Sequence, residues 1–237
     1  MIERLDSLPS LPKTVSAARI KALCSTYCNT VGIDLFRQTV NGLTTAYFGG
    51  ISGSFSLEAE DNADFGELSA YFRFLGASVF CNSATAVRLD CRRRTASGLY
   101  ELKAEADATL NDGHGSIAEI YEKLQNGLDG DIVLPPFDDW YTDFCARFNH
   151  GAAEYSETPT AVAVTGFMTE SISLITGVAV AADHRKTGEG SAVLRTLIHN
   201  IRKKYPQSRI FAAANAAAGF YIKNGFSHVG NVAVCEF

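Results

Sequence analysis

The sequence predicts a mixed α/β protein of the α+β kind, built from two parts that share a β-β-α-β order. Three observations support this. Hydrophobic residues make up 46% and charged residues 20% of the 237 residues, which is typical of a globular chain with a substantial core. Apolar β-branched runs alternate with segments whose apolar residues recur every 3.6 positions, which indicates strands and helices in turn. The order from Thr160 onward is β-β-α-β-α-β, and residues 1–108 echo its first four elements.

Two helices are predicted at the start of the second part. They are Ser116–Gly127 and Phe137–Gly151, joined by a loop that contains Leu-Pro-Pro. Ser116 and Glu119 form a Ser-x-x-Glu pattern, which is typical of a capped helix N-terminus. The pattern supports the first of these helices.

A hairpin and a long helix follow. Thr160–Met168 and Ser171–Ala181 are apolar, β-branched runs separated by two polar residues, which predicts two antiparallel strands. After the second run, apolar residues keep the helical period from Val193 to Ile201. The helix is expected to end before Pro206, because proline cannot continue it.

Three shorter elements complete the second part. RIFAAA predicts a strand, AAAGFYIKNGF predicts a helix that ends at Asn224-Gly225, and SHVGNVAVCEF predicts the last strand.

The first part repeats this order in outline, which suggests an internal duplication. LTTAYFGGISGSFSLEA predicts a hairpin, FGELSAYFRFLG a helix and ASVFCN a strand. Between hairpin and helix this part carries the acidic linker EDNAD, without glycine, which would repel a phosphate. We place the boundary between domains 1–108 and 109–237, in a stretch rich in turn formers.

Composition argues against several classes of function. The net charge of −5 argues against a nucleic-acid partner, although His184–Phe237 carries eight Lys/Arg against two Glu. No apolar run reaches the length of a membrane span and no secretory signal is recognisable, so a cytoplasmic protein is expected. The six cysteines form no Cys-x-x-Cys pair, so neither a metal site nor a disulfide framework is predicted.

The segment HRKTGEGSAVLRTL places a basic turn with two glycines directly before the long helix. A helix N-terminus favours an anion, because its N–H groups are unpaired and its dipole is positive there. Gly188 and Gly190 let a ligand approach the backbone closely. Arg185 and Lys186 attract phosphate, and the arginine can donate two parallel N–H groups to it. The turn therefore predicts a phosphate site.

Two familiar phosphate motifs do not fit this turn. A P-loop needs a lysine after its last glycine, whereas Ser191 follows Gly190. A dinucleotide fingerprint needs a third glycine where Val193 stands, within a βαβ unit. What remains is Arg-x-x-Gly-x-Gly between a strand and a helix. It resembles the acetyl-CoA pyrophosphate loop of the GNAT superfamily of N-acyltransferases.

The resemblance covers residues 160–226 and implies a GNAT-like mixed, mostly antiparallel sheet flanked by helices. Val178-Ala179-Val180 resembles the splayed strand whose free backbone groups pair with pantetheine, and Asn215 resembles an asparagine that contacts the cofactor. The cofactor-binding residues implied are the strand end, the loop and this asparagine: Val178, Ala179, Val180, Arg185, Lys186, Thr187, Gly188, Glu189, Gly190, Ser191 and Asn215.

Acyl transfer from a thioester to an amine needs a neutral nucleophile, a polarised carbonyl and a proton for the leaving thiolate. The resemblance implies a backbone N–H near Val180 for the carbonyl and Tyr221 as general acid to the sulfur. The alternative for Tyr221 is a helix residue that packs its ring and keeps its hydroxyl outward. Glu170 in the hairpin turn is the candidate base, with a merely solvated glutamate as the alternative. No cysteine lies in the loop or near Tyr221 in sequence, so direct transfer in a ternary complex is expected.

Acceptor recognition is expected from Phe137–Gly151, which resembles the acceptor side of some bacterial members. The segment gathers aromatic and polar residues: Trp140, Tyr141, Asp143, Arg147 and His150. The simplest interpretation is an ion pair between Asp143 and Arg147, four positions apart, with Trp140 in the core. The alternative has Asp143 or His150 facing an acceptor amine.

The sequence therefore predicts an N-acetyltransferase that transfers an acetyl group from acetyl-CoA to a primary amine of a small molecule or peptide. The first part would be a degenerate copy, as in tandem members, that completes the acceptor cleft. The rival hypothesis is a non-catalytic acyl-CoA-binding sensor or interaction module. The amine acceptor is the expected partner, and a homodimer is left open. No nucleic acid, membrane or metal is expected.

Overall fold

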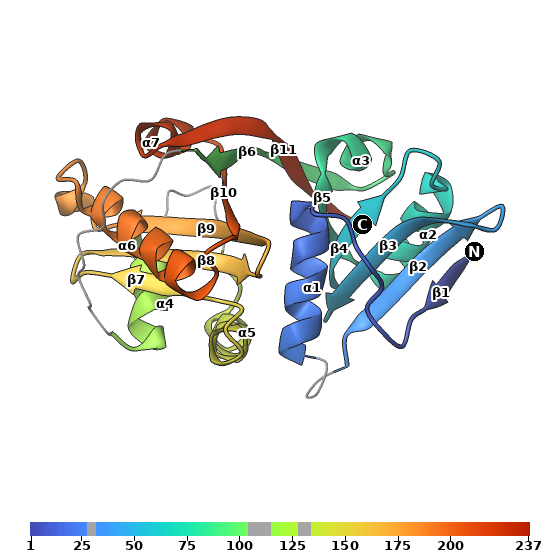
Figure 1. Ribbon diagram of the computed structural model, residues 1–237, viewed down its shortest axis with the longest axis horizontal. Helices are drawn as coiled ribbons and strands as arrows, with labels where there is room; N and C mark the ends of the chain where they lie inside the picture. The colour runs from blue at the N-terminus through green and yellow to red at the C-terminus, as the bar shows by residue number, and fades with distance from the viewer. Residues whose placement is uncertain (28–31, 104–114, 128–133) are drawn as a thin grey trace. The chain divides into compact units, whose positions relative to one another are not determined.

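The computed structural model describes residues 1–27, 32–103, 115–127 and 134–237 (Figure 1). They form two compact units. Unit 1 comprises Met1–Leu99 and Val229–Phe237, and unit 2 comprises Tyr100–His228. The domain boundary expected at residues 108/109 lies outside the described residues.

Unit 1 is a mixed sheet with helices packed on it. Its elements are β1 (Ile2–Arg4), α1 (Val15–Tyr27), β2 (Asp34–Val40), β3 (Leu43–Ile51), β4 (Ser54–Ala59), α2 (Phe65–Leu75), β5 (Ser78–Asn82), α3 (Ser83–Arg88), most of β6 (Arg93–Leu102) and the end of β11 (Phe226–Glu236). The strand order is β1-β2-β3-β4-β5-β11. All neighbours are antiparallel except β4 and β5, which are parallel. α1 packs on β3, β4 and β5.

Unit 2 repeats this arrangement. Its elements are the end of β6, α4 (Ile117–Gly127), α5 (Phe137–Asn149), β7 (Tyr155–Glu157), β8 (Ala161–Met168), β9 (Ile172–Val180), the 3-10 turn η1 (Ala182–His184), α6 (Glu189–Lys204), β10 (Arg209–Ala214), α7 (Ala218–Lys223) and the start of β11. The strand order is β11-β6-β10-β9-β8-β7. β7, β8 and β9 are antiparallel neighbours, whereas β9 and β10 are parallel.

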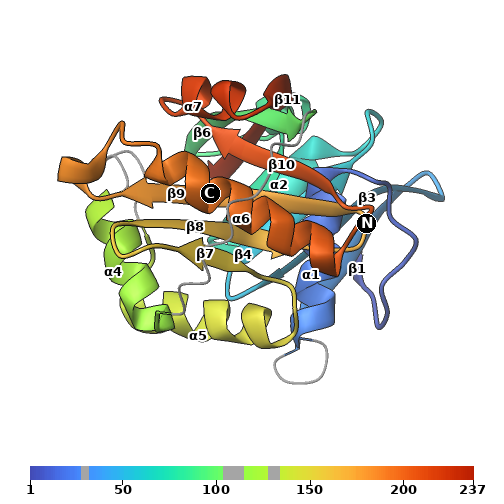
Figure 2. The ribbon, with the colours of Figure 1, turned by 60° about the vertical axis from the view of Figure 1, so that its left-hand side comes forward.

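The unit 2 sheet is buried on both faces (Figure 2). On one face, Val193, Leu194 and Leu197 of α6 pack with Ala163 and Ile175 of the sheet. On the other, α4 and α5 cover the alternate residues of β8, because successive side chains of a strand point to opposite faces. The strands of unit 2 are therefore held in place from both sides.

The elements predicted from local patterns are confirmed in type and position. The hairpin strands are β8 and β9, the long helix is α6, and the N-terminal echo is β3, β4, α2 and β5. The capping pattern forms as expected, since the Ser116 N–H donates to Glu119 Oε2 at 2.7 Å and the Glu119 N–H donates to Ser116 Oγ at 3.3 Å. Within the described ranges, no helix is long and apolar enough to cross a membrane.

Candidate functional site

The parallel strands β9 and β10 separate halfway along β9. Their register runs from Ile172 opposite Arg209 to Ile175 opposite Ala212 and stops there. β9 nevertheless continues to Val180, which stays in register with Ala161 of β8. The last residues of β9 therefore keep their partner on one edge only.

Strand geometry gives the direction of the backbone N–H and C=O groups at the end of β9. The Ala181 N–H donates to the Thr160 carbonyl at 2.8 Å, so residue 181 points its backbone toward β8. Backbone groups of successive strand residues point to opposite edges. The N–H and C=O of Val180 and Val178 therefore point to the open edge, as the splayed strand predicts.

A β-bulge lies where the strands separate. The β8–β9 register shifts around Thr165, and Gly166 and Thr176 fall outside it. A side chain at position 166 would meet Thr176, since its Cβ would lie 2.5 Å from Thr176 Cγ2. Arg147 of α5 donates to the Gly166 carbonyl at 2.5 Å and so fixes the bulge. Bulges bend a strand and increase its twist, which accounts for the opening.

The loop after β9 leads into an uncapped helix N-terminus. Lys186 and Gly188 adopt left-handed φ values of 66° and 98°, and α6 begins at Glu189. No side chain among the described residues caps this end. A Cβ built at Gly188 would meet nothing within 4 Å, so the space beside it is open. The N–H groups of the first turn of α6 can therefore receive an anion.

Gly190 allows the helix start to pack closely on β9 and α7. A Cβ at this position would lie 3.1 Å from Val180 Cγ2 and 3.4 Å from Phe220 Cε2. α7 thus reaches the start of α6 through Phe220.

The side chains of Arg185 and Glu189 hold the loop in place. Arg185 donates to the carbonyls of Gly127 at 3.2 Å and Val180 at 3.4 Å. Glu189 accepts from the Thr160 hydroxyl and lies 3.1 Å from His184 Nδ1. The Thr160 hydrogen bond is the main reason that the pKa of Glu189 falls below its usual range. The predicted paired contact of Arg185 with phosphate would require its guanidinium to leave these carbonyls.

The remaining predicted cofactor residues lie at the same end of unit 2. Thr187 donates its hydroxyl to the His184 carbonyl at 2.7 Å, and Ser191 is half-buried in the first turn of α6. Asn215 is exposed directly after β10, and its carbonyl accepts from the Ala218 N–H at 3.1 Å. The predicted cofactor residues therefore lie at the ends of the parallel strands β9 and β10, beyond the point where these strands separate.

Tyr221 lies in the core of unit 2. Its side chain is 3% exposed and packs edge-on against Phe220 and Phe226, with ring centroids 5.2 and 5.4 Å apart. Burial raises its pKa well above the usual range for tyrosine. The hydroxyl therefore keeps its proton at neutral pH, as a proton donor must.

Glu170, the predicted base, does not lie near the loop after β9. It is exposed in the turn before Ile172, whereas the loop follows Val180 at the other end of the nine-residue β9, about 30 Å long. Its charge instead contributes to the raised pKa of Tyr205 at the C-terminus of α6, where burial is the main cause.

A cavity of about 430 Å³ adjoins the end of β9. It is lined by Glu119, Glu122, Lys123, Asn126 and Gly127 of α4 and by Pro159, Thr160 and Ala181 at the strand ends. Lys123 donates to Glu157 Oε2 at 2.5 Å and to the Thr158 carbonyl at 2.9 Å. Sequence reasoning missed these α4 residues, although their spacing of three and four already indicates one helix face.

The acceptor-side segment follows its simplest interpretation. Arg147 pairs with Asp143 at 2.5 Å, and Trp140 stacks on Phe144 in the core with ring centroids 4.8 Å apart. His150 Nδ1 lies 2.8 Å from the Ala146 carbonyl, and Tyr141 is 40% exposed. Asp143 therefore forms an ion pair within α5 and orients Arg147, which holds the bulge.

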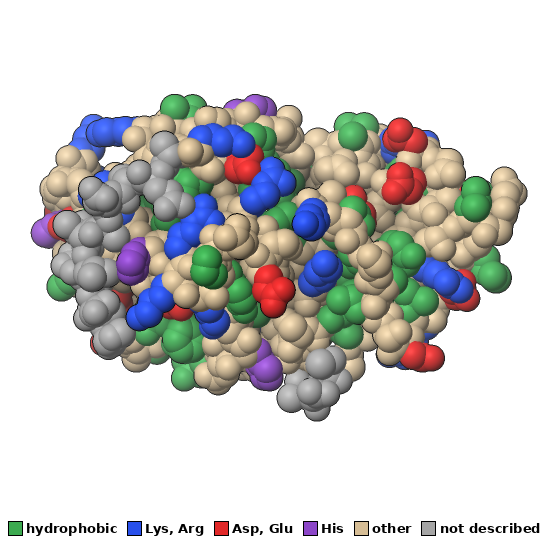
Figure 3. Space-filling model, in the orientation of Figure 1, with side chains coloured by type: hydrophobic (Ala, Val, Ile, Leu, Met, Phe, Trp, Pro, Cys, Tyr) green, Lys and Arg blue, Asp and Glu red, His purple; other side chains and the backbone are tan. Residues whose placement is uncertain are grey.

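Positive charge lies along α6, with most of it in the last turn, at the end opposite the loop. Figure 3 shows Lys and Arg side chains over the part of unit 2 that carries α6. The last turn of α6 alone supplies Arg202, Lys203 and Lys204. The described residues contain no cluster of three or more metal-ligating side chains.

Comparison with known proteins agrees with this geometry. Residues 149–228, which include β9, the loop, α6 and α7, match the acetyltransferase (GNAT) domain. This part of the chain is therefore similar to GNAT acetyltransferases. No curated protein matches the sequence.

Solved structures show the same fold over nearly the whole chain. A GNAT-family acetyltransferase from Colwellia psychrerythraea is 12% identical with a TM-score of 0.54, and the match covers 100% of this chain and 99% of that one. A GCN5-related N-acetyltransferase from Sphaerobacter thermophilus is 13% identical with a TM-score of 0.56, over 93% and 91%. Another, from Kribbella flavida, is 12% identical with a TM-score of 0.55, over 97% and 96%. At these identities the likeness concerns the fold.

Proposed function

We propose that unit 2 binds acetyl-CoA and transfers its acetyl group directly to a primary amine of a small molecule or peptide. One observation carries the proposal: the β9–β10 pair opens after Ile175, directly before an uncapped helix N-terminus entered through left-handed Gly188. A pantetheine arm and a pyrophosphate need these two features side by side.

The residues present fit the donor. The N–H groups of the first turn of α6 would hold the pyrophosphate, with Gly188 leaving room for it. The open edge of β9, at Val178 and Val180, would pair with the amides of pantetheine once Arg185 leaves the Val180 carbonyl. Lys186 supplies an exposed cation beside the loop.

The chemistry is acyl transfer, for which acetyl-CoA supplies an activated thioester. The Val180 N–H, which points to the open edge, would stabilise charge that develops on the carbonyl oxygen. Tyr221 would give its proton to the departing sulfur, although burial raises the pKa of its hydroxyl and makes it a weaker acid than an exposed tyrosine. Glu170, the proposed base, could take the amine proton only through water, because it lies at the far end of β9.

Calorimetric titration with acetyl-CoA tests the cofactor site. Gly188→Asp should weaken binding at least about tenfold, because it places a carboxylate where the phosphate would sit. The matched control is Gly53→Asp in unit 1, since Gly53 also has a positive φ, of 78°, and open space around it. Wild-type protein that binds no acetyl-CoA would overturn the proposal.

A screen of amines then separates catalysis from binding alone. Tyr221→Phe should lower kcat about a hundredfold and leave the acetyl-CoA affinity unchanged. Glu170→Gln in the same assay decides whether that carboxylate takes part. The alternative, an acyl-CoA sensor, predicts binding by the wild type without turnover of any amine.

A further inference from the structure

Two short helices occupy equivalent places in the two units. α3 and α7 have six residues each, and each follows the strand that is parallel to the one before the long helix. Each ends in a basic residue, Arg88 in α3 and Lys223 in α7. The two cations are therefore structural counterparts.

In unit 1 this cation contacts the entry of the long helix. Arg88 Nη1 donates to the Asp61 carbonyl at 2.6 Å, in the linker between β4 and α2. Its guanidinium also lies 3.9 Å above the ring of Phe65, the first residue of α2. Arg88 thus spans from α3 to the segment that corresponds to the glycine loop of unit 2.

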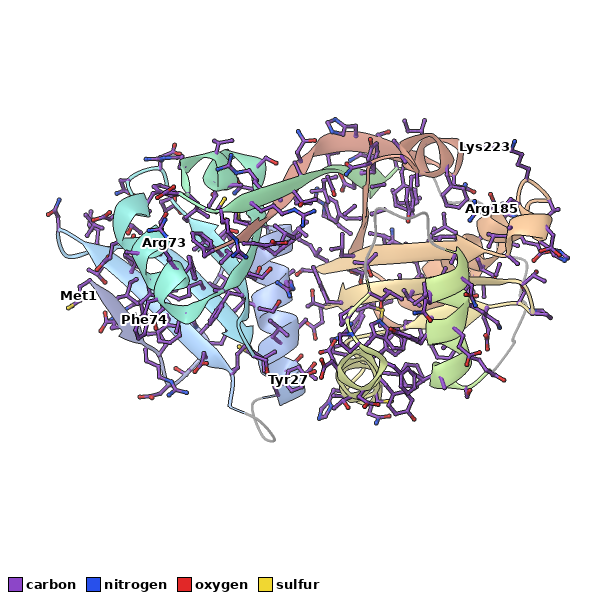
Figure 4. All side chains as sticks on the ribbon, turned by 180° about the vertical axis from the view of Figure 1, so that it is seen from behind. Met1, Tyr27, Arg73, Phe74, Arg185 and Lys223 are labelled. Carbon is purple, nitrogen blue, oxygen red and sulfur yellow. The ribbon has the colours of Figure 1, made fainter. Side chains whose placement is uncertain are left out.

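In unit 2 the corresponding helix, α7, packs against the uncapped N-terminus of α6. Phe220 of α7 is the residue that approaches Gly190 at the start of α6. Lys223 follows three positions later, on the same helix face. It is exposed, and within the described part of the chain it has no hydrogen bond or ion pair. Figure 4 shows Lys223 and Arg185 at the same end of unit 2.

The cations that flank the loop are not equally available. The Arg185 guanidinium already donates to two backbone carbonyls, whereas Lys223 is unengaged. We propose that Lys223 is a phosphate-binding residue of the donor site and donates to a phosphate of coenzyme A from α7. The proposal rests on the function proposed above. It gives unit 2 a second element, besides the loop, that recognises the nucleotide end of the donor.

Calorimetry with coenzyme A tests this contact directly. Lys223→Ala should weaken binding about tenfold, which is typical of the loss of a charge-assisted hydrogen bond, and Lys223→Arg should retain most of the affinity. The control is Lys203→Ala, which removes the same charge from the last turn of α6. Unchanged melting temperatures would show that folding is unaffected.

Dephospho-coenzyme A identifies the phosphate. If Lys223 binds the 3′-phosphate, Lys223→Ala will leave the affinity for dephospho-coenzyme A unchanged. If it binds the pyrophosphate, the variant will bind both ligands more weakly, by the same factor. Affinities unchanged by Lys223→Ala for both ligands would overturn the proposal. Failure of the wild type to bind coenzyme A is a separate result, which would refute the proposed function itself.

Discussion

The two units build the same strand opening and differ in what stands before the helix. In unit 1 the β4–β5 register stops at Ser56 opposite Phe80, while β3 follows β4 as far as Ala59. This is the opening seen between β9 and β10 in unit 2. The strand opening alone therefore does not distinguish the two units.

The helix entries show the difference. In unit 1, Asp64 caps α2 by accepting from the Glu67 N–H at 2.9 Å. In unit 2, Gly188 takes this position with no side chain to offer. A helix end that binds its own carboxylate is both filled and less positive. The few residues between strand and helix decide whether the N-terminus of the helix is available to a ligand.

The last residues of the chain belong to unit 1. Residues 232–236 of β11 are in register with β5 in unit 1, although β11 follows the elements of unit 2 in the chain. Conversely, Tyr100 and Leu102 at the end of β6 belong to the core of unit 2. Unit 1 is therefore completed by a strand that follows unit 2 in the chain.

Removal of residues 230–237 should have the largest effect. Unit 1 would lose the partner of β5 and four apolar side chains, Val232, Ala233, Cys235 and Phe237. At roughly 1–3 kcal/mol for each buried side chain, the loss is comparable with the stability of a whole domain. We expect amide hydrogen exchange to show lost protection in β4 and β5 and retained protection in β8 and β9. Full protection of β5 would show that unit 1 folds without β11.

The cap of α2 should contribute less. Asp64→Ala removes the acceptor for the Glu67 N–H, which typically costs about 1 kcal/mol and lowers the melting temperature by about 2–4 °C. Acetyl-CoA affinity should not change. Asp61→Ala is the control, because the Asp61 carboxylate is exposed in the same linker, 3.8 Å from Arg88. An equal loss in both variants would assign the effect to linker charge and not to the cap.

Local patterns were enough to predict the parts of the fold that carry the proposed site. β8 and β9 are β-branched apolar runs, α6 keeps its apolar residues on one stripe, and Gly188 enters α6 as the loop pattern indicates. These features depend on neighbours in sequence. The Ser116–Glu119 cap was predictable for the same reason.

Features that depend on distant parts of the chain could not be predicted. The bulge at Thr176 depends on Gly166 and Arg147, and the position of the Arg185 guanidinium depends on the Gly127 carbonyl at the end of α4. Helix α1 has no strong apolar stripe, because most of its faces are buried. The pairing of β11 with β5 leaves no local signal, since any strand pattern fits several partners.

The smallest expected effect concerns a carboxyl group at the strand opening of unit 1. It belongs to β4, the strand that corresponds to β9 in unit 2. Glu58 of β4 lies beyond the last β4–β5 register pair and accepts from the Thr14 hydroxyl at 2.6 Å. Burial raises its pKa above the usual range, and the Thr14 hydrogen bond only partly opposes this. The folded state therefore binds this proton more tightly than the unfolded state. The resulting stability is present at low pH and is lost as the pH rises through the folded pKa.

Glu58→Gln should accordingly raise the melting temperature at pH 7 and remove this dependence on pH. We expect a gain below about 1 kcal/mol, because solvent screens a carboxyl that is only partly buried. Melting temperatures of the wild type, Glu58→Gln and the exposed-site control Asp61→Asn, measured from pH 4 to pH 8, would check this. A lower melting temperature for Glu58→Gln at pH 7 would mean that the charged hydrogen bond to Thr14 outweighs burial. The opening in unit 1 would then be built around a carboxylate.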